Sequence, residues 1–185
     1  MRRFLVLLTL ASTASCASSG STPESTIAMP SERVVAVDNH GVLRTTVAPN
    51  AKVPIPGAPA RAFEALRAVY EELEIPIGTM DAAKGHIGNT DFWKTRTLGK
   101  VPLSTYLHCG ESVTGPAADN YRVYISLVSV MRSDGMGGSE LETALAATAR
   151  NMEGTAGTRV ACGSTGRLED RIRTSVLLKL SAGPP

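Results

Sequence analysis

The chain contains 185 residues, 43% of them hydrophobic and 19% charged, with a formal net charge of +2. This length suits a single domain, and no apolar run approaches the roughly 20 residues that a membrane-spanning helix needs. Arg2 and Arg3 lie in an N-terminal leader, and the other 17 of the 19 basic residues balance the 17 acidic ones. A balanced charge without a cluster of Lys and Arg argues against nucleic acid as a partner.

The first sixteen residues have the order of a signal peptide, in which a basic pair precedes the apolar run 4–11 and small residues up to Ala17. The segment from Thr13 to Cys16 resembles the lipobox of bacterial lipoproteins, whose cysteine receives a diacylglycerol and becomes the new N-terminus. Such boxes usually carry Leu where this chain has Thr13, and the small residues also suit an ordinary signal peptidase. We therefore predict a signal peptide at 1–16 and export to the periplasm-facing cell envelope. Cys16 is the predicted lipid anchor in the outer membrane, and simple cleavage is the alternative.

Residues 17–31 read ASSGSTPESTIAMPS, a stretch rich in Ser, Thr and Pro that offers little to bury. This composition predicts a flexible tether that gives the following domain reach from a membrane surface. We expect one folded domain over 32–181 and a short tail over 182–185.

Two β-hairpins are predicted in the first half of the domain. The runs 33–38 (RVVAVD) and 42–48 (VLRTTVA) are rich in β-forming residues, and Asn39-His40-Gly41 between them suits a tight turn. Short strands at 75–80 and 86–90 are expected to form the second hairpin.

A helix is predicted between these hairpins, over 60–73. Its apolar residues recur at three- and four-residue spacing, and charged residues occupy the other side. Pro59 suits the first helical turn. We expect the apolar stripe to pack on a sheet. A membrane-surface helix is the alternative, but the polar face is mixed in charge and not basic.

An insertion without long elements is predicted to follow and to end at Cys109. Segments 92–96 and 103–107 are short and mixed, and Gly99 and Pro102 interrupt the chain between them, so we expect small helical turns. Trp and Tyr are typical of binding hot spots. A candidate partner-binding surface is therefore formed by three aromatic residues of the insertion: Phe92, Trp93 and Tyr106. The alternative is that these rings cover one end of the sheet as a satellite core.

The second half of the domain is predicted to contain a long β-hairpin. Residues 121–131 (YRVYISLVSVM) form the longest β-type run, and a glycine-rich turn follows at 134–138. Apolar residues alternate over 140–150, which favours a strand. Ser139 and Glu142 could instead form the capping box of a helix.

A last short strand at 158–162 and a second helix are predicted to complete the domain. Ser164 and Thr165 suit the helix start, and four apolar residues follow at four-residue spacing, Leu168, Ile172, Val176 and Leu180. The fold class is therefore α+β, with two helices packed on one face of an antiparallel sheet in a helix-grip-like arrangement. One core is expected to contain Phe63, Leu66, Tyr70, Val123, Ile125, Leu127, Leu168, Ile172 and Val176.

The cysteine count predicts one disulfide. With Cys16 assigned to the leader, Cys109 and Cys162 remain as an even pair in an oxidising compartment. The alternatives are a metal site that adds His108 and the distant His86, or a nucleophilic cysteine beside His108. Neither cysteine belongs to a C-x-x-C motif, and neighbouring side chains on a strand point to opposite faces.

Other constellations give weak signals for chemistry. Asp38, His40 and Ser112 could form a triad on paper, but no spacing favours it. Residues 163–166 could bind an anion at a helix start, although a capping role is commoner. Residues 135–138 lack the third glycine of a dinucleotide loop. We predict no catalytic residues, no metal site and no cofactor.

The order of elements, the leader and the tether accompany a more local resemblance. Ala62-Phe63-Glu64-Ala65-Leu66 leads into Glu74-Ile75-Pro76-Ile77, and residues 81–87 turn into the next strand. Over 60–89 this organisation resembles the BamC lipoproteins of the bacterial β-barrel assembly machinery. The chain departs from that family in having one candidate domain and a cysteine pair. The resemblance implies an accessory or scaffolding role in an envelope protein complex at a membrane. The alternatives are a small-ligand carrier, with a groove between sheet and helix, and a small periplasmic enzyme.

Overall fold

The computed structural model describes residues 31–37, 41–47, 52–152 and 159–182. Seven strands form one antiparallel sheet. Its order is β4 (Thr79–Asp81), β5 (His86–Thr95), β11 (Arg122–Ser133), β12 (Ser139–Arg150), β13 (Arg159–Ser164) and β8 (Leu107–His108), and β3 (Lys52–Ile55) pairs with the free part of β12. The described part of the chain also contains three α-helices, three two-stranded sheets, a 3-10 helix and one disulfide. The α+β class with a dominant antiparallel sheet, predicted from the sequence, is confirmed. The predicted signal peptide, Cys16 and nearly all of the tether lie outside the described residues.

The centre of the sheet is the hairpin of β11 (Arg122–Ser133) and β12 (Ser139–Arg150), which pair along all twelve residues of each strand. The strand predicted at 140–150 is therefore confirmed over the helix alternative. The glycine-rich segment between them is a hairpin turn, in which Asp134 Oδ1 accepts hydrogen bonds from the amides of Met136 and Gly138 at 2.8 and 2.9 Å.

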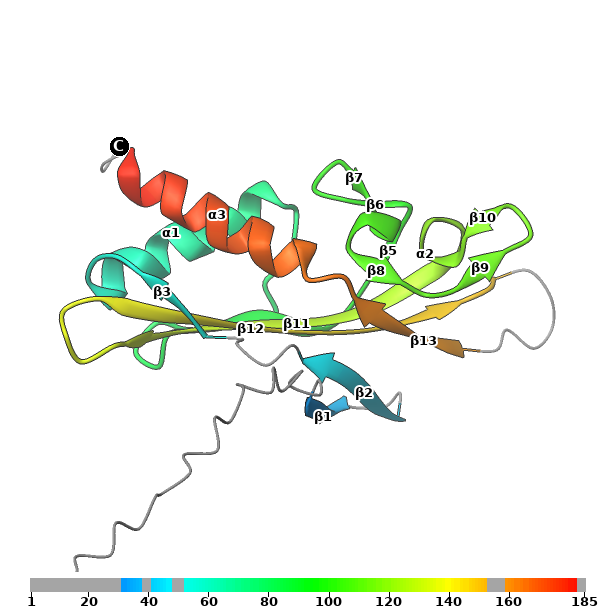
Figure 1. The fold of residues 1–185 in the computed structure, drawn as a ribbon, viewed down its shortest axis with the longest axis horizontal. Helices are drawn as coiled ribbons and strands as arrows, with labels where there is room; N and C mark the ends of the chain where they lie inside the picture. Colours follow the sequence, from blue (N-terminus) through cyan, green and yellow to red (C-terminus); the bar gives the residue numbers. More distant parts are fainter. Residues whose placement is uncertain (1–30, 38–40, 48–51, 153–158, 183–185) are drawn as a thin grey trace, which may run out of the picture.

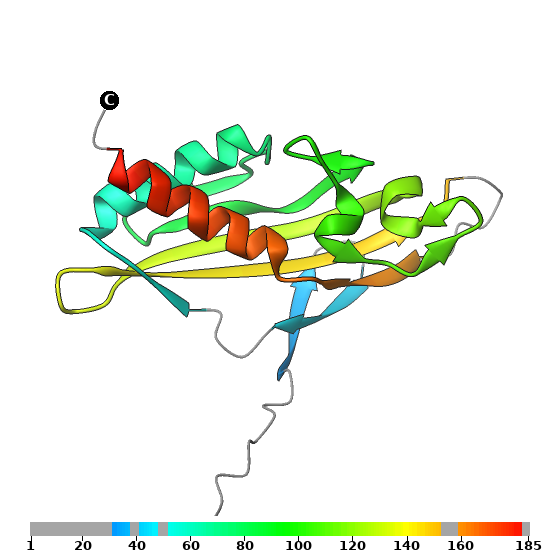
Figure 2. The same ribbon diagram turned by 45° about the horizontal axis from the view of Figure 1, so that its top comes forward.

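The two long helices are α1 (Pro59–Glu72) and α3 (Arg167–Ser181). Helix α1 contacts β11, while α3 contacts both β12 and α1. Figures 1 and 2 show both helices on the same side of the sheet. The predicted start of α3 was early by two residues, because Gly166 is the N-cap and its positive φ of 80° turns the chain into the helix. Ser164 Oγ instead accepts a hydrogen bond from the Gly166 amide.

The core lies between these helices and the sheet. All nine residues predicted to share one core do so, together with side chains from the insertion. The Tyr70 hydroxyl is also buried there and donates a hydrogen bond to Ser129 Oγ at 2.9 Å, which lies 2.9 Å from Thr143 Oγ1. Burial raises the pKa of Tyr70 well above its ordinary value, so this hydroxyl remains a neutral donor.

The second hairpin is present but differs in extent from the prediction. It consists of β4 (Thr79–Asp81) and β5 (His86–Thr95), so residues 92–95 belong to a strand and not to the predicted helical turn. The reason is a β-bulge. Asn89 lies opposite Leu127 and Phe92 lies opposite Ile125, so β5 has one more residue than β11 between these two pairs. This extra residue interrupts the alternation of inward and outward side chains along β5.

The insertion begins after β5 and consists of very short elements. One of them, the 3-10 helix η1 (Leu103–Thr105), agrees with the small helical turn predicted at 103–107. The others are β6 (Thr97–Leu98), β7 (Val101–Pro102), β8 (Leu107–His108), β9 (Glu111–Ser112), β10 (Gly115–Pro116) and α2 (Ala117–Asn120). The predicted last strand is also present as β13 (Arg159–Ser164), and β3 spans Lys52–Ile55.

The N-terminal hairpin predicted from the sequence is confirmed. Strand β1 (Ser31–Val37) pairs with β2 (Gly41–Val47), and β2 contacts β12 and β13. Figures 1 and 2 show this hairpin on the side of the sheet opposite to the helices. We call the sheet surface on that side the outer face.

Candidate functional site

The candidate site is built from alternate residues of β11. Val123, Ile125 and Leu127 point into the core and are buried. Successive side chains of a strand point to opposite faces, so Arg122 and Tyr124 lie on the outer face. This face has no helix over it, and Arg122 and Tyr124 are only partly buried there.

Trp93 joins this site from the neighbouring strand β5. It lies directly opposite Tyr124, and 53% of its surface is exposed. The prediction that Phe92, Trp93 and Tyr106 form one surface in an irregular insertion is wrong. Phe92 is buried opposite Ile125, and Tyr106 is buried in the core, where its hydroxyl accepts a hydrogen bond from Arg171. These two rings belong to the main core and not to a separate satellite core, and of the three only Trp93 is exposed.

Each outer-face ring of this group is covered by a guanidinium group. The Arg122 guanidinium carbon lies 4.5 Å from the centroid of Trp93, and that of Arg159 lies 5.3 Å from the centroid of Tyr124. Both distances are within the range of a cation–π interaction. The Nε atom of Arg122 is buried without a hydrogen-bond partner. The two guanidinium groups therefore help to hold the rings in place.

Three arginines form a line across the sheet beside these rings. Arg122 of β11 lies opposite Arg150 of β12, and Arg150 lies opposite Arg159 of β13. We call Arg122, Arg150 and Arg159 the arginine row. Among the described residues, neither Arg122 nor Arg150 forms an ion pair. Side chains directly opposite each other lie about 5 Å apart, and like charges at this distance destabilise a sheet.

The arginine row corrects the expectation that the chain has no basic cluster. The three residues are far apart in the sequence, and none of them belongs to a run of basic residues. Only the strand register brings them together. The signal that could have found them is alternation, because each arginine is in phase with the outward positions of its own strand once the pairing is known.

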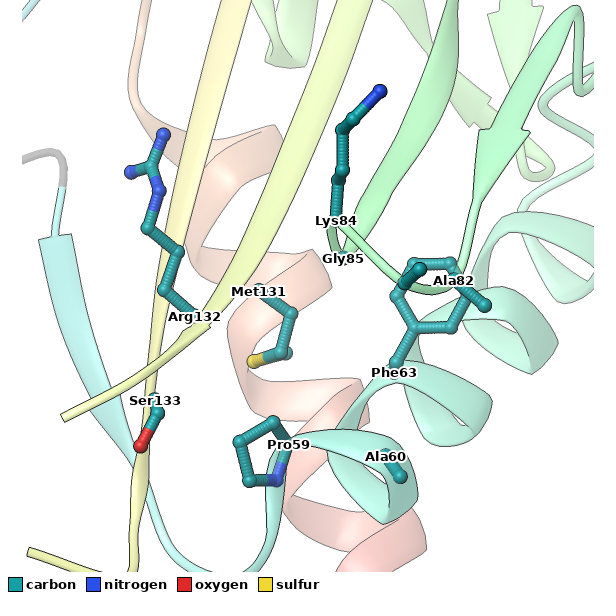
Figure 3. Close-up of a pocket in the computed structure, with 10 residues that line it drawn as sticks. Pro59, Ala60, Phe63, Ala82, Lys84, Gly85, Met131, Arg132 and Ser133 are labelled. Carbon is teal, nitrogen blue, oxygen red and sulfur yellow. The ribbon is translucent and has the colours of Figure 1, made fainter. Parts of the chain in front are cut away.

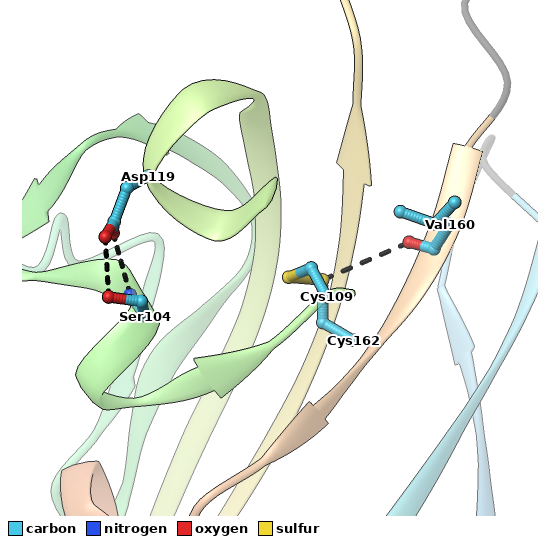
Figure 4. Close-up of a disulfide and its surroundings, with 5 residues drawn as sticks. All are labelled: Ser104, Cys109, Asp119, Val160 and Cys162. Atoms are coloured by element: carbon cyan, nitrogen blue, oxygen red, sulfur yellow. Dashed lines mark hydrogen bonds between the residues drawn. A yellow bond between two sulfur atoms is a disulfide. The ribbon is translucent and has the colours of Figure 1, made fainter. Parts of the chain in front are cut away.

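The predicted disulfide is present between Cys109 and Cys162, whose Cα atoms are 4.2 Å apart. Cys162 lies on β13 opposite Ala147, and both cysteines are buried in the core (Figure 4). The bond joins the insertion to β13, shortly before α3, as the spacing suggested. Because both sulfurs are bonded, the alternatives of a nucleophilic thiol and of a thiolate metal ligand do not apply to this form.

Hydrogen bonds also hold the insertion together. Asp119 accepts two of them from Ser104, one from the amide at 2.8 Å and one from Oγ at 2.5 Å (Figure 4). Arg171 of α3 donates to the Gly99 carbonyl at 3.2 Å. These contacts and the disulfide make the insertion a structural extension of the core.

A separate pocket of about 450 Å³ lies at the other end of the molecule. It is formed by the first turn of α1, the β4–β5 turn and the end of β11, and its lining includes Pro59, Phe63, Lys84, Met131 and Arg132 (Figure 3). Lys84 forms an ion pair with Asp81, and Arg132 forms one with Glu142. Its lining is therefore of mixed polarity. It lies at the rim of the fold, where the start of α1 faces the end of β11.

The weaker chemical constellations gain no support from the geometry. Asp38 and His40, two members of the triad considered with Ser112, lie outside the described residues. Ser164 and Thr165 bond to the backbone and to Glu169 around the start of α3. Within the described ranges, no three His, Cys, Asp or Glu side chains converge as a metal site.

No protein-family model matches this chain, and no curated protein sequence matches it. In the part of the chain that the structure describes, no helix has the length and apolar character that a membrane crossing requires.

Proposed function

We propose that this protein is an exported, lipid-anchored envelope protein with an accessory or scaffolding role in a membrane-associated complex. The leader and Cys16 support export and anchoring. The observation that carries the docking role is Trp93, which is half exposed on the outer face and stacked under Arg122. Interface hot spots are enriched in Trp, Tyr and Arg, and this site combines all three.

The setting of Trp93 favours binding because the ring is already ordered. At Trp93 the strand β5 pairs with β11, and Arg122 covers one face of the ring. A partner that packs on a fixed ring loses less conformational entropy than one that must first order a mobile side chain. The outer face is therefore suited to a stable protein contact.

A small-ligand carrier is the second candidate, and the pocket at the end of β11 is the observation in its favour. Its volume is adequate for a small molecule. The expected groove between sheet and helix is, however, filled by core side chains such as Leu66, Ile125 and Ile172. The scaffold hypothesis therefore agrees better with the packing.

Affinity purification of the exported protein from detergent-solubilised membranes tests the docking role. An envelope protein should copurify with the wild type and be lost with Trp93→Ala. Met136→Ala is the matched control, because Met136 is 93% exposed in the β11–β12 turn, far along the sheet from Trp93. Retention of the same partner by Trp93→Ala would contradict this docking site.

Mass spectrometry of the mature N-terminus tests export and anchoring. We expect a chain that begins at Cys16 and carries a diacylglycerol. A chain that still begins at Met1 would contradict export, and an unmodified start at Ser18 would contradict the anchor alone.

A further inference from the structure

Two members of the arginine row, Arg122 and Arg150, have donor groups without an ion-pair partner among the described side chains. On the same strand and face, Arg132 donates to Glu142 at 2.8 Å, so the far end of the outer face neutralises its own charge. Among the described residues, Arg122 and Arg150 have no such carboxylate. Among the described side chains of β11 and β12, the unpaired positive charge of the outer face therefore lies at the end of the sheet that carries Trp93.

We propose that the arginine row and Trp93 together bind an acidic, extended segment of a partner protein. This inference rests on the proposed docking role and names the chemistry of the partner. A guanidinium group donates two parallel hydrogen bonds to one carboxylate, so neighbouring arginines match Asp or Glu side chains. Trp93 supplies an apolar surface for the aliphatic parts of the same segment.

The composition and size of the site favour a protein segment over an anionic membrane. Membrane recognition by charge uses clusters of about four to eight Lys or Arg residues, whereas this row has three. One of them, Arg159, also covers Tyr124. The chain beyond its leader is otherwise balanced in charge. A narrow row beside two aromatic rings is the composition of a protein interface.

Two structural features define the orientation of the bound segment. The row crosses β11, β12 and β13, so it runs perpendicular to the strands. The β1–β2 hairpin lies on this side of the sheet and contacts β12 and β13, so the outer face is not an open plane. Trp93 lies one strand beyond Arg122, on β5. The segment should therefore reach from β13 across to Trp93 at the β5 side.

Trp93 is the only tryptophan of the chain, so selectively excited tryptophan fluorescence reports on this site alone. The purified exported protein is titrated with hexaglutamate, and with hexaglutamine as the uncharged control. We expect a saturable change in emission with hexaglutamate and none with hexaglutamine. Raising the salt concentration should weaken the binding, because the screening length falls from about 10 Å at 0.1 M to about 3 Å at 1 M.

Arg150→Gln should weaken hexaglutamate binding by about threefold to fivefold, as expected for the loss of one exposed ion pair. Arg150 does not cover Trp93, so this change leaves the reporter intact. Arg132→Gln is the matched control on the same face and should bind as the wild type does. Thermal melts of both variants establish that they are folded.

Three outcomes would overturn the inference. They are equal responses to the two peptides, unchanged binding by Arg150→Gln, or an Arg150-dependent response to phosphatidylglycerol vesicles with none to hexaglutamate. If the envelope partner is lost with Trp93→Ala but kept with Arg150→Gln, the docking role stands and only the acidic chemistry fails. If Trp93→Ala keeps the partner, the proposed docking site itself fails.

Discussion

The two faces of β11 show two uses of one strand. On the inner face, Val123, Ile125 and Leu127 are buried against the helices and belong to the common core. On the outer face, Arg122 is only partly buried, lies opposite Arg150 and covers Trp93. The inner face therefore stabilises the fold, whereas the charge repulsion on the outer face opposes folding. An arrangement of like charges that costs stability is what a binding function would explain.

The largest loss of stability is expected on the inner face. Ile172→Ala and Leu66→Ala remove fully buried side chains, so each should lower the free energy of unfolding by about 2 to 5 kcal/mol in urea denaturation. Leu178→Ala on α3 is the control, because Leu178 is exposed, and it should cost less than about 0.5 kcal/mol. A loss below that value at both buried sites would show that the assigned helix faces are wrong.

Removal of the disulfide should have the next largest effect. The bond spans a sequence separation of 53 residues, and a loop of this length corresponds to roughly 4 kcal/mol in the chain-entropy model. Cys109→Ser with Cys162→Ser should lower the melting temperature but leave hexaglutamate binding at low temperature, since the outer face lies on other residues. Reduction of the wild type should reproduce the loss. Two free thiols at these positions in the unreduced protein would contradict the prediction.

A smaller effect is expected from the buried hydroxyls of the inner face. Tyr70→Phe removes one donor and leaves Ser129 bonded to Thr143, so it should cost about 1 kcal/mol. Ser129→Ala should cost more, because it takes the 2.9 Å partner from both Tyr70 and Thr143. Chemical denaturation of the two variants measures this order, and the reverse order would contradict the hydrogen-bond network.

The smallest effect should have the opposite sign and is expected on the outer face. Arg150→Glu replaces two like-charge neighbours by two opposite-charge pairs, with Arg122 and Arg159, and should stabilise the protein by a few tenths of a kcal/mol to about 1 kcal/mol. The same variant should lose hexaglutamate binding. Arg132→Glu, which breaks the pair with Glu142, should instead lower the melting temperature. A destabilised Arg150→Glu would remove the argument that the row opposes folding.

Much of the fold could be predicted from local pattern. Helix α1 and strands β11 and β12 have long, regular periods, and the nine core residues follow from those periods. The disulfide followed from cysteine count and compartment. The prediction went wrong where regularity ends, because the bulge between Asn89 and Phe92 interrupts the alternation of β5 and made a strand look like an irregular segment.

The candidate site was only half visible in the sequence. Trp93 stood out as a single tryptophan, but its expected neighbours, Phe92 and Tyr106, are core residues. Its actual neighbour, Arg122, comes from β11, and Arg150 and Arg159 come from strands still farther along the chain. The net charge of the sequence counts these arginines in a total that acidic residues balance. It does not show that the three arginines lie on adjacent strands.

The sequence by itself determined the periodicity of each long element, the inward or outward phase of its residues and the cysteine pair. These properties depend on neighbours within a few positions or on simple counting. Only the tertiary structure decided which outward residues meet, because strand register is set by pairing between segments distant in the chain, and a shift of one residue would turn each arginine to the other face. The arginine row, and with it the proposed partner chemistry, exists only in that register.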